Sequence, residues 1–208
     1  MEVIHGSSNG LVASATGVPA AQFWSQGTTG ISGENETSDR FGTALASGEF
    51  NGDNFSDLAI GIPGEDITVS GTAHPNAGRA VIIYGSPVGL AASGTSMVRA
   101  AQTFDLCSGT LPTVITEGIS SQIFPDNASL GQSLAWGDFN GDTIGDLAIG
   151  APNMTVKSDG AFFADSEAGQ VWILFGSLNN GLVRSGSQIV TQIGNLSVFG
   201  LTGPRTGW

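Results

Sequence analysis

The chain has 208 residues, with 32 glycines and only six Lys or Arg residues against 18 Asp or Glu residues, which gives a formal net charge of −12. So few basic residues exclude the electrostatic footprint of a protein that binds nucleic acid or an anionic lipid surface. Abundant glycine, together with Val, Ile, Phe and Thr, favours short strands joined by tight turns, so we expect an all-β fold.

The sequence also lacks targeting and membrane signals. Residues 1–6 contain neither a basic stretch nor a long apolar segment, so no signal peptide is expected. No apolar run approaches the length that crosses a bilayer, so no membrane insertion is expected. Cys107 is the single cysteine, which excludes an intrachain disulfide.

Apolar segments recur along the chain in groups of four. The first group predicts strands near 41–48, 57–62, 79–84 and 96–103, and the second near 130–137, 146–151, 170–175 and 187–192. Val3-Ile4-His5 leads into Gly6-Ser7, as later strands lead into the Gly-Ser turns at 85–90 and 176–182, so it repeats a third strand. Phe199-Gly200 repeats the opening of a group. Repeated groups of four short strands are typical of β-propeller blades.

This pattern predicts blades of four antiparallel strands, with two full blades and partial flanking blades. The expected units are the outer strands of a preceding blade at 1–30, full blades at 31–115 and 116–193, and the first strand of a following blade at 194–208. Propellers close with about four to eight blades. We therefore expect a segment of a longer polypeptide, in preference to a ring that several chains complete.

Two acidic loops lie between the first and second strands of the two groups. Each loop has an acidic or amide side chain at positions 1, 3, 5 and 9 and a backbone carbonyl at position 7, which is how a short loop wraps oxygen ligands around calcium. The expected ligands are Glu49, Asn51, Asp53, the Phe55 carbonyl and Asp57 in the first loop, and Asp138, Asn140, Asp142, the Ile144 carbonyl and Asp146 in the second.

Two other interpretations of these loops are weaker. Turns rich in Asn, Gly and Asp can simply connect strands, but two copies keep every ligand position. A helix-loop-helix calcium site needs Gly at position 6 and Glu at position 12. The first loop has Asn54 and Ile60 there, and the second has Thr143 and Ile149. We therefore predict two calcium sites of structural function.

The paired motifs around these loops resemble the FG-GAP repeats of integrin α-subunit propellers and their bacterial relatives. Phe41-Gly42 with Gly61-Ile62-Pro63 matches the two motifs, and Leu130-Gly131 with Gly150-Ala151-Pro152 matches with one change. Glu49 stands where the family has Asp. The resemblance implies a calcium-stabilised propeller module of an extracellular or cell-surface protein that serves adhesion or ligand recognition.

Antiparallel strands should place the cation loops and the Gly-Ser turns at one end of each blade. The long, irregular segments 64–77 and 153–168, together with 104–126, should lie at the opposite end, where a protein or glycan ligand is expected. Other blades of the same or neighbouring chains are the other expected partners. The sequons at Asn35, Asn54, Asn127, Asn153 and Asn195 fit a glycosylated, secreted chain.

No arrangement of residues predicts catalysis. His5 holds a strand position and should pack at a blade edge, while His74 should be solvated. Trp24, Trp136 and Trp172 should fill space between blades. A solvated acidic rim is expected at the long-loop end, formed by Glu65, Asp66, Asp159, Asp165 and Glu167. Two alternative functions stay open: a purely structural element of a surface layer or filament, and a non-catalytic part of a secreted hydrolase or lectin.

Overall fold

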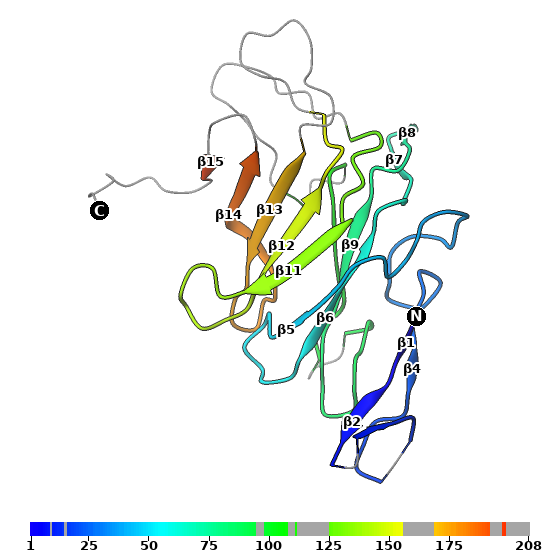
Figure 1. Cartoon of the computed structure of the whole chain (residues 1–208), viewed down its shortest axis with the longest axis vertical. Helices are drawn as coiled ribbons and strands as arrows, with labels where there is room; N and C mark the ends of the chain where they lie inside the picture. The colour runs from blue at the N-terminus through cyan, green and yellow to red at the C-terminus, as the bar shows by residue number, and fades with distance from the viewer. Residues whose placement is uncertain are drawn as a thin grey trace, which may run out of the picture.

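A computed structural model describes residues 1–8, 10–14, 16–94, 98–107, 111, 125–155, 169–191 and 197–198. The described residues form strands and no helix (Figure 1). No helix among them is therefore long and apolar enough to cross a membrane. The all-β prediction is confirmed, and the two large sheets have the antiparallel strand order expected of propeller blades, although the described strands do not close a ring.

The first blade is a four-stranded antiparallel sheet in the order β10-β9-β6-β5. Its strands are β5 (Leu45–Gly48), β6 (Asp57–Ile62), β9 (Arg79–Ile83) and β10 (Gln102–Asp105). The second blade contains β11 (Ser133–Gly137), β12 (Asp146–Ala151), β13 (Gln170–Phe175) and β14 (Val183–Thr191) in sequential order. The short strand β15 (Ser197–Val198), in the segment expected to open a following blade, pairs with β14.

The amino-terminal segment forms small sheets beside the first blade. Strand β1 (Glu2–Val3) pairs with β4 (Gln22–Phe23), and β2 (His5–Ser7) pairs with β3 (Gly10–Val12). We call β1 and β4 the N-terminal strand pair. It lies at the lower right in Figure 1, on the side of the first blade that faces away from the second blade.

The first strand of each blade begins later than expected. Gly42 and Gly131 have φ values of 88° and 85°, so the Phe-Gly and Leu-Gly pairs form turns before β5 and β11. The fourth strand of the first blade starts at Gln102, and the Ala101 amide just before it donates to the Ala92 carbonyl at 2.8 Å. The fourth strand of the second blade is longer than expected.

Segment 64–77 was expected to be irregular, and this expectation is wrong. It carries a hairpin of β7 (Ile67–Val69) and β8 (Thr72–His74). The two residues between these strands, Ser70 and Gly71, have φ values of 51° and 82°. Positive φ at both central residues is the turn that matches the twist of a two-residue hairpin. The hairpin lies at the end of the blade opposite the loop between β5 and β6, as expected (Figure 1).

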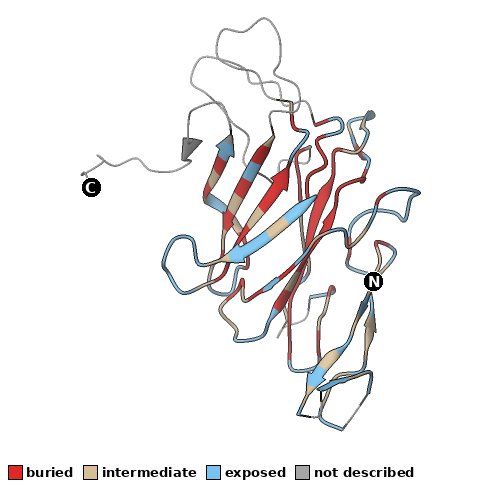
Figure 2. Cartoon of the chain, viewed as in Figure 1, coloured by how far each residue is buried: buried red, intermediate tan, exposed pale blue. Residues whose placement is uncertain are grey.

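The core consists of two layers between neighbouring sheets. One cluster joins the two blades and includes Phe50, Tyr84, Leu147, Trp172 and Ile189, all at most 1% exposed. The other joins the N-terminal strand pair to the first blade and includes Trp24, Ile60 and Ile83. Figure 2 shows that buried residues follow the middle strands, whereas β11 is mostly exposed.

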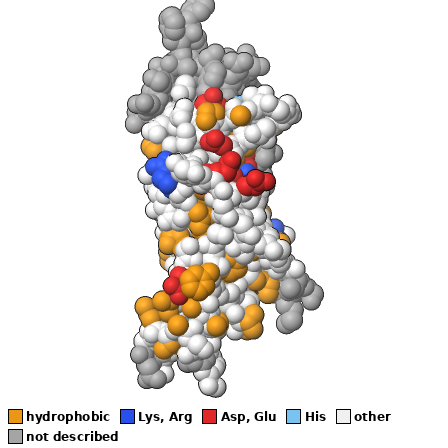
Figure 3. All heavy atoms as spheres, turned by 90° about the vertical axis from the view of Figure 1, so that its right-hand side faces the viewer, with side chains coloured by type: hydrophobic (Ala, Val, Ile, Leu, Met, Phe, Trp, Pro, Cys, Tyr) orange, Lys and Arg blue, Asp and Glu red, His pale blue; other side chains and the backbone are white. Residues whose placement is uncertain are grey.

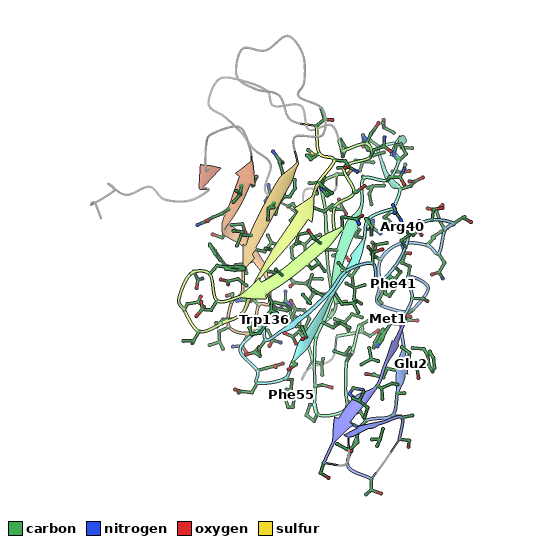
Figure 4. The ribbon with its side chains drawn as sticks, viewed as in Figure 1. Met1, Glu2, Arg40, Phe41, Phe55 and Trp136 are labelled. Atoms are coloured by element: carbon green, nitrogen blue, oxygen red, sulfur yellow. The ribbon has the colours of Figure 1, made fainter. Side chains whose placement is uncertain are left out.

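Trp24 and Trp172 fill space between sheets, as expected, with 7% and 1% exposure. The same expectation is wrong for Trp136, which is 55% exposed. Its ring lies over Gly48 of the first blade, but β11 is the edge strand of its sheet and has no further strand beside it (Figure 4).

Glycine permits a close approach between the blades at the FG-GAP motifs. A Cβ on Gly61 would lie 1.9 Å from the carbonyl oxygen of Gly131, so no side chain fits there. Gly61 also accepts from the Gly42 amide at 3.0 Å, which joins the two motifs of one repeat. The motif glycines therefore hold the strand ends together within one blade and against the next.

Candidate metal centre

The two acidic loops occupy the same place in their blades. Residues 49–56 connect β5 to β6, and residues 138–145 connect β11 to β12. Gly48 pairs with Asp57 at the base of the first loop, as Gly137 pairs with Asp146 at the base of the second. Phe55 lies near the tip of the first loop (Figure 4).

Each loop turns through two residues with positive φ. In the first loop these are Gly52 and Asn54, at 77° and 68°, and in the second Gly141 and Thr143, at 79° and 74°. Gly and Asn adopt this conformation readily, whereas Thr does so at a cost. Because the two loops share this backbone shape, acidic side chains at corresponding positions lie in corresponding places.

In the first loop, the side chains at positions 1, 3 and 5 bend back towards the backbone. Glu49 Oε1 accepts from the Gly52 amide at 2.6 Å, and Asp53 Oδ1 accepts from the Phe55 amide at 2.8 Å. The Asn51 side-chain amide donates to Asp53 Oδ2 at 2.9 Å. The side chains of positions 1, 3 and 5 are thereby drawn to the inside of one turn.

The second loop repeats these bonds. Asp138 Oδ1 accepts from the Gly141 amide at 2.7 Å, and Asp142 Oδ1 accepts from the Ile144 amide at 2.8 Å. The Asn140 side-chain amide donates to Asp142 Oδ2 at 2.9 Å, as in the first loop. The shorter Asp138 therefore takes the same part as Glu49, so the change at position 1 preserves the arrangement.

The position 9 carboxylates lie at the base of the loops, where each accepts hydrogen bonds from backbone amides. Asp57 accepts from the Phe50 and Gly85 amides, both at 2.8 Å, and is 1% exposed. Asp146 is 0% exposed and accepts from the Phe139 and Gly176 amides at 2.7 and 2.9 Å. Gly85 and Gly176 belong to the Gly-Ser turns, so these turns help to hold the cation loops. This contact was not predicted from the sequence, although the turns repeat together with the loops.

Burial makes these two carboxylates unfavourable as anions. The pKa of Asp57 is raised to about 7, mainly by desolvation and also by the neighbouring carboxylates of Asp53 and Glu49, against the lowering effect of the amides of Gly85 and Phe50. Desolvation likewise raises the pKa of Asp146. A bound cation would favour the charged form of both groups.

The donor set of each loop suits a hard cation. It offers carboxylate, amide and backbone oxygens, the ligands that calcium prefers. Within the described ranges, however, no three His, Cys, Asp or Glu side chains are gathered as a metal-binding group. Here the carboxylates face backbone amides and not a common point. The residue types and their order fit calcium, and the gathering of the oxygens around one ion stays a prediction.

The remaining candidate residues lie elsewhere. His5 is half-buried, with Nε2 3.3 Å from Gln22 Oε1, and so packs at the edge of the N-terminal sheets. His74 was expected to be solvated, but its Nδ1 lies 2.8 Å from Oδ1 of Asp126. Asp159, Asp165 and Glu167 of the expected acidic rim lie outside the described residues, as do most of segments 104–126 and 153–168 and the sequon at Asn195.

Glu65 was expected in that acidic rim, and this expectation is wrong because Glu65 is buried. It is 3% exposed, pairs with Arg79 at 2.6 Å and accepts from the Gln26 side chain. The amino-terminal segment covers this pair, since a Cβ on Gly33 would touch Arg79 and Glu65. Asp66, by contrast, is exposed as expected. Arg79 is one of only six basic residues and stands at the start of a strand. This was the one signal in the sequence that could have indicated the Glu65–Arg79 ion pair.

Comparisons with known proteins agree with the repeats. A family model described as FG-GAP repeat matches residues 41–83 and 130–174. The chain is 32% identical to human phosphatidylinositol-glycan-specific phospholipase D over 146 residues, 70% of this chain but 14% of that protein. The bovine protein of the same name is 31% identical over 149 residues, with the same coverage of 70% and 14%. The chain thus spans a small part of the length of these relatives.

Proposed function

The chain belongs to the FG-GAP repeat family, and we propose that it is a calcium-binding β-propeller module that serves adhesion or ligand recognition outside the cell. One observation carries the calcium part of the proposal. Two loops repeat the same oxygen donors and the same bonds, and each closes on a buried carboxylate whose pKa is raised.

Calcium would be held by Glu49, Asn51, Asp53, Asp57 and the Phe55 carbonyl in the first loop, and by Asp138, Asn140, Asp142, Asp146 and the Ile144 carbonyl in the second. The ion supplies positive charge among carboxylates that otherwise repel one another. The chain's own groups fix the loop shape: the backbone amides orient the carboxylates, and the Gly-Ser turn holds the position 9 side chain. The function of the ion is therefore structural.

Recognition is proposed at the long-loop end, away from the cation loops. The β7–β8 hairpin projects there, and long loops on a rigid scaffold are common sites of recognition. The net charge of −12 favours a protein or glycan partner with a basic patch. Exchanging residues 67–74 for a Gly-Ser connection should weaken binding to such a partner, measured by surface plasmon resonance, and unchanged affinity would place recognition elsewhere.

The relatives are named for action on phosphatidylinositol-glycan, but this chain aligns with 14% of their length. We propose that this chain is non-catalytic. Where it forms part of a longer protein with hydrolase activity, that activity belongs to the other domains. An extracellular location fits the calcium loops and the sequons, of which Asn35 is exposed. Mass spectrometry of the glycosylated protein would test that location.

Calcium binding is tested by thermal unfolding. At a hundredfold excess of calcium over its dissociation constant, each site should add about 2.7 kcal/mol to the free energy of unfolding. Asp53→Asn and Asp142→Asn should each remove part of that gain. Glu34→Gln, at an exposed residue outside both loops, is the matched control. Identical melting curves in calcium and in chelator would contradict the proposal.

A further inference from the structure

The two acidic loops differ in the side chain at position 1, which is Glu49 in the first loop and Asp138 in the second. Both carboxylates accept hydrogen bonds from backbone amides of their own loop. They divide those bonds differently between their two oxygens, and the division decides which oxygen can turn towards a cation.

Glu49 accepts its backbone bonds through one oxygen. Its Oε1 lies 3.0 Å from the Asn51 nitrogen, 2.6 Å from the Gly52 nitrogen and 3.2 Å from the Asp53 nitrogen. Among the residues that the structure describes, no group donates to Glu49 Oε2. Each carboxylate oxygen carries lone pairs that can accept a donor or bind a cation. Oε2 can therefore bind a cation while Oε1 keeps the turn in place.

Asp138 uses both of its oxygens. Its Oδ1 accepts from the Gly141 amide at 2.7 Å and from the Asp142 amide at 3.0 Å. Its Oδ2 accepts from the Thr143 amide at 2.9 Å. The aspartate side chain is one methylene shorter than that of Glu49, and its three donors are spread over two oxygens. Neither oxygen is left without a backbone bond.

The residue at position 6 matches this difference. Thr143 has a φ of 74°, a costly conformation for a β-branched residue, and its bond to Asp138 offsets part of that cost. Its counterpart Asn54 has a φ of 68°, which asparagine tolerates. The amides that Glu49 holds belong to residues 51–53, so Asn54 is not among its donors.

The side chains at positions 3 and 5 do not differ in this way. The Asn51 amide donates to Asp53 at 2.9 Å, and the Asn140 amide donates to Asp142 at the same distance. Asp53 and Asp142 each accept from the backbone amide two residues later, both at 2.8 Å. The contrast between the loops therefore lies at position 1.

We propose that Glu49 binds calcium without giving up a backbone bond, whereas Asp138 releases the Thr143 amide when it binds calcium. This inference rests on the calcium function proposed above. Asp138 Oδ2 holds one amide and Oδ1 holds two, so Oδ2 turns to the ion with the smaller loss of hydrogen bonds. Calcium thus changes the second loop at Thr143 and leaves the turn of the first loop as it is.

Hydrogen exchange of single amides, followed by nuclear magnetic resonance, tests this inference. The Thr143 amide should exchange about tenfold faster in calcium than in chelator, because it loses a bond to a charged group. The Gly52 amide stays on Glu49 Oε1 and should not exchange faster. An unchanged Thr143 amide, in a protein that calcium stabilises, would overturn this inference and leave the calcium function standing. A protein that calcium does not affect at all would overturn both.

Two amide substitutions separate binding from folding. Glu49→Gln keeps one oxygen for the backbone bonds and replaces the other with an NH₂ group, which repels a cation. Titration calorimetry should then find one bound calcium in place of two, while the melting temperature in chelator matches wild type. Asp138→Asn removes the acceptor of the Thr143 amide, so its melting temperature in chelator should be lower. Equal melting temperatures of the two variants in chelator would contradict the proposed division of oxygens.

The loss of a carboxylate needs a control outside the loops. Figure 3 shows acidic side chains gathered in the upper part of the face that it presents, so negative charge is not confined to the loops. Glu34→Gln, at an exposed residue before β5, removes one such charge. It should change neither the number of bound calcium ions nor the melting temperature in chelator. The loss of a calcium ion in Glu34→Gln would show that overall charge, and not Glu49, governs binding.

Discussion

At the scale of single residues, the buried Glu65–Arg79 pair links the first blade to the segment that covers it. Glu65 is nearly inaccessible to solvent, and its pKa is raised to about 7, mainly by desolvation. The carboxylates of Asp39 and Glu36 contribute to this rise, whereas the Arg79 guanidinium and the Gln26 side chain oppose it. Folding therefore takes up a proton at Glu65 between its ordinary pKa of 4.5 and about 7.

The predicted consequence is a pH-dependent stability. Because the folded state binds the extra proton, the contribution of Glu65 is most favourable below pH 4.5 and is progressively lost as the pH rises through about 7. Urea unfolding at several pH values should show this decline. Glu65→Gln should flatten it, and Glu34→Gln, at an exposed carboxylate of the covering segment, should not. An unchanged slope in Glu65→Gln would contradict the assignment.

At the scale of strands and turns, the motif glycines differ between the two blades although their sequences match. Gly61 faces the backbone of Gly131 in the next blade, whereas a Cβ on its counterpart Gly150 would meet only the Ser133 hydroxyl, at 2.3 Å. A side-chain hydroxyl can rotate away, but a backbone carbonyl inside a packed contact cannot.

Gly61→Ala should therefore lower the free energy of unfolding by about 3 kcal/mol, near the upper end of the usual effect of overpacking. Gly150→Ala should cost clearly less, because among the described residues its Cβ would clash only with the Ser133 hydroxyl. Chemical denaturation of both variants measures the difference. Equal losses would show that the contact within the blade, and not the contact between blades, requires the glycine.

At the scale of the whole molecule, stability should depend on contacts between neighbouring blades, as in other repeat proteins. The clamp of Gln102 on Leu182 is one such contact: the Gln102 side chain donates to the Leu182 carbonyl and accepts from the Leu182 amide, so it satisfies both backbone groups of a buried residue. The Tyr84 hydroxyl also accepts from the Leu182 amide, at 3.3 Å, and supports the same contact.

Gln102→Ala should cost about 2 kcal/mol, because it leaves the Leu182 carbonyl unpaired and weakens the bonding of its amide. The same substitution at Gln188, where the described structure shows no partner, should leave the free energy of unfolding of the monomer unchanged. Thermal unfolding at low concentration compares them. A similar loss in both variants would refute the role of the clamp between blades.

The sequence predicted the repeated elements better than the contacts between them. Strand order, the position of the acidic loops and the end of the blade that carries the long segments follow from local patterns that recur. The burial of Glu65 and the exposure of Trp136 depend on which neighbour covers each residue, and no local pattern encodes that. The clamp of Gln102 on Leu182 joins residues far apart in the chain, so only the three-dimensional structure revealed it.

The two acidic loops share their donors but not their surroundings. The carbonyls of the first loop accept hydrogen bonds from the second blade, since the Gly145 and Asn179 amides donate to Glu49 and Asn51, both at 2.7 Å. The corresponding loop of the second blade is mostly exposed. A preorganised site loses less conformational entropy when its ligand arrives. The two near-identical loops would therefore bind calcium with unequal affinity. Each blade that packs against its predecessor would raise the calcium affinity of the predecessor's loop.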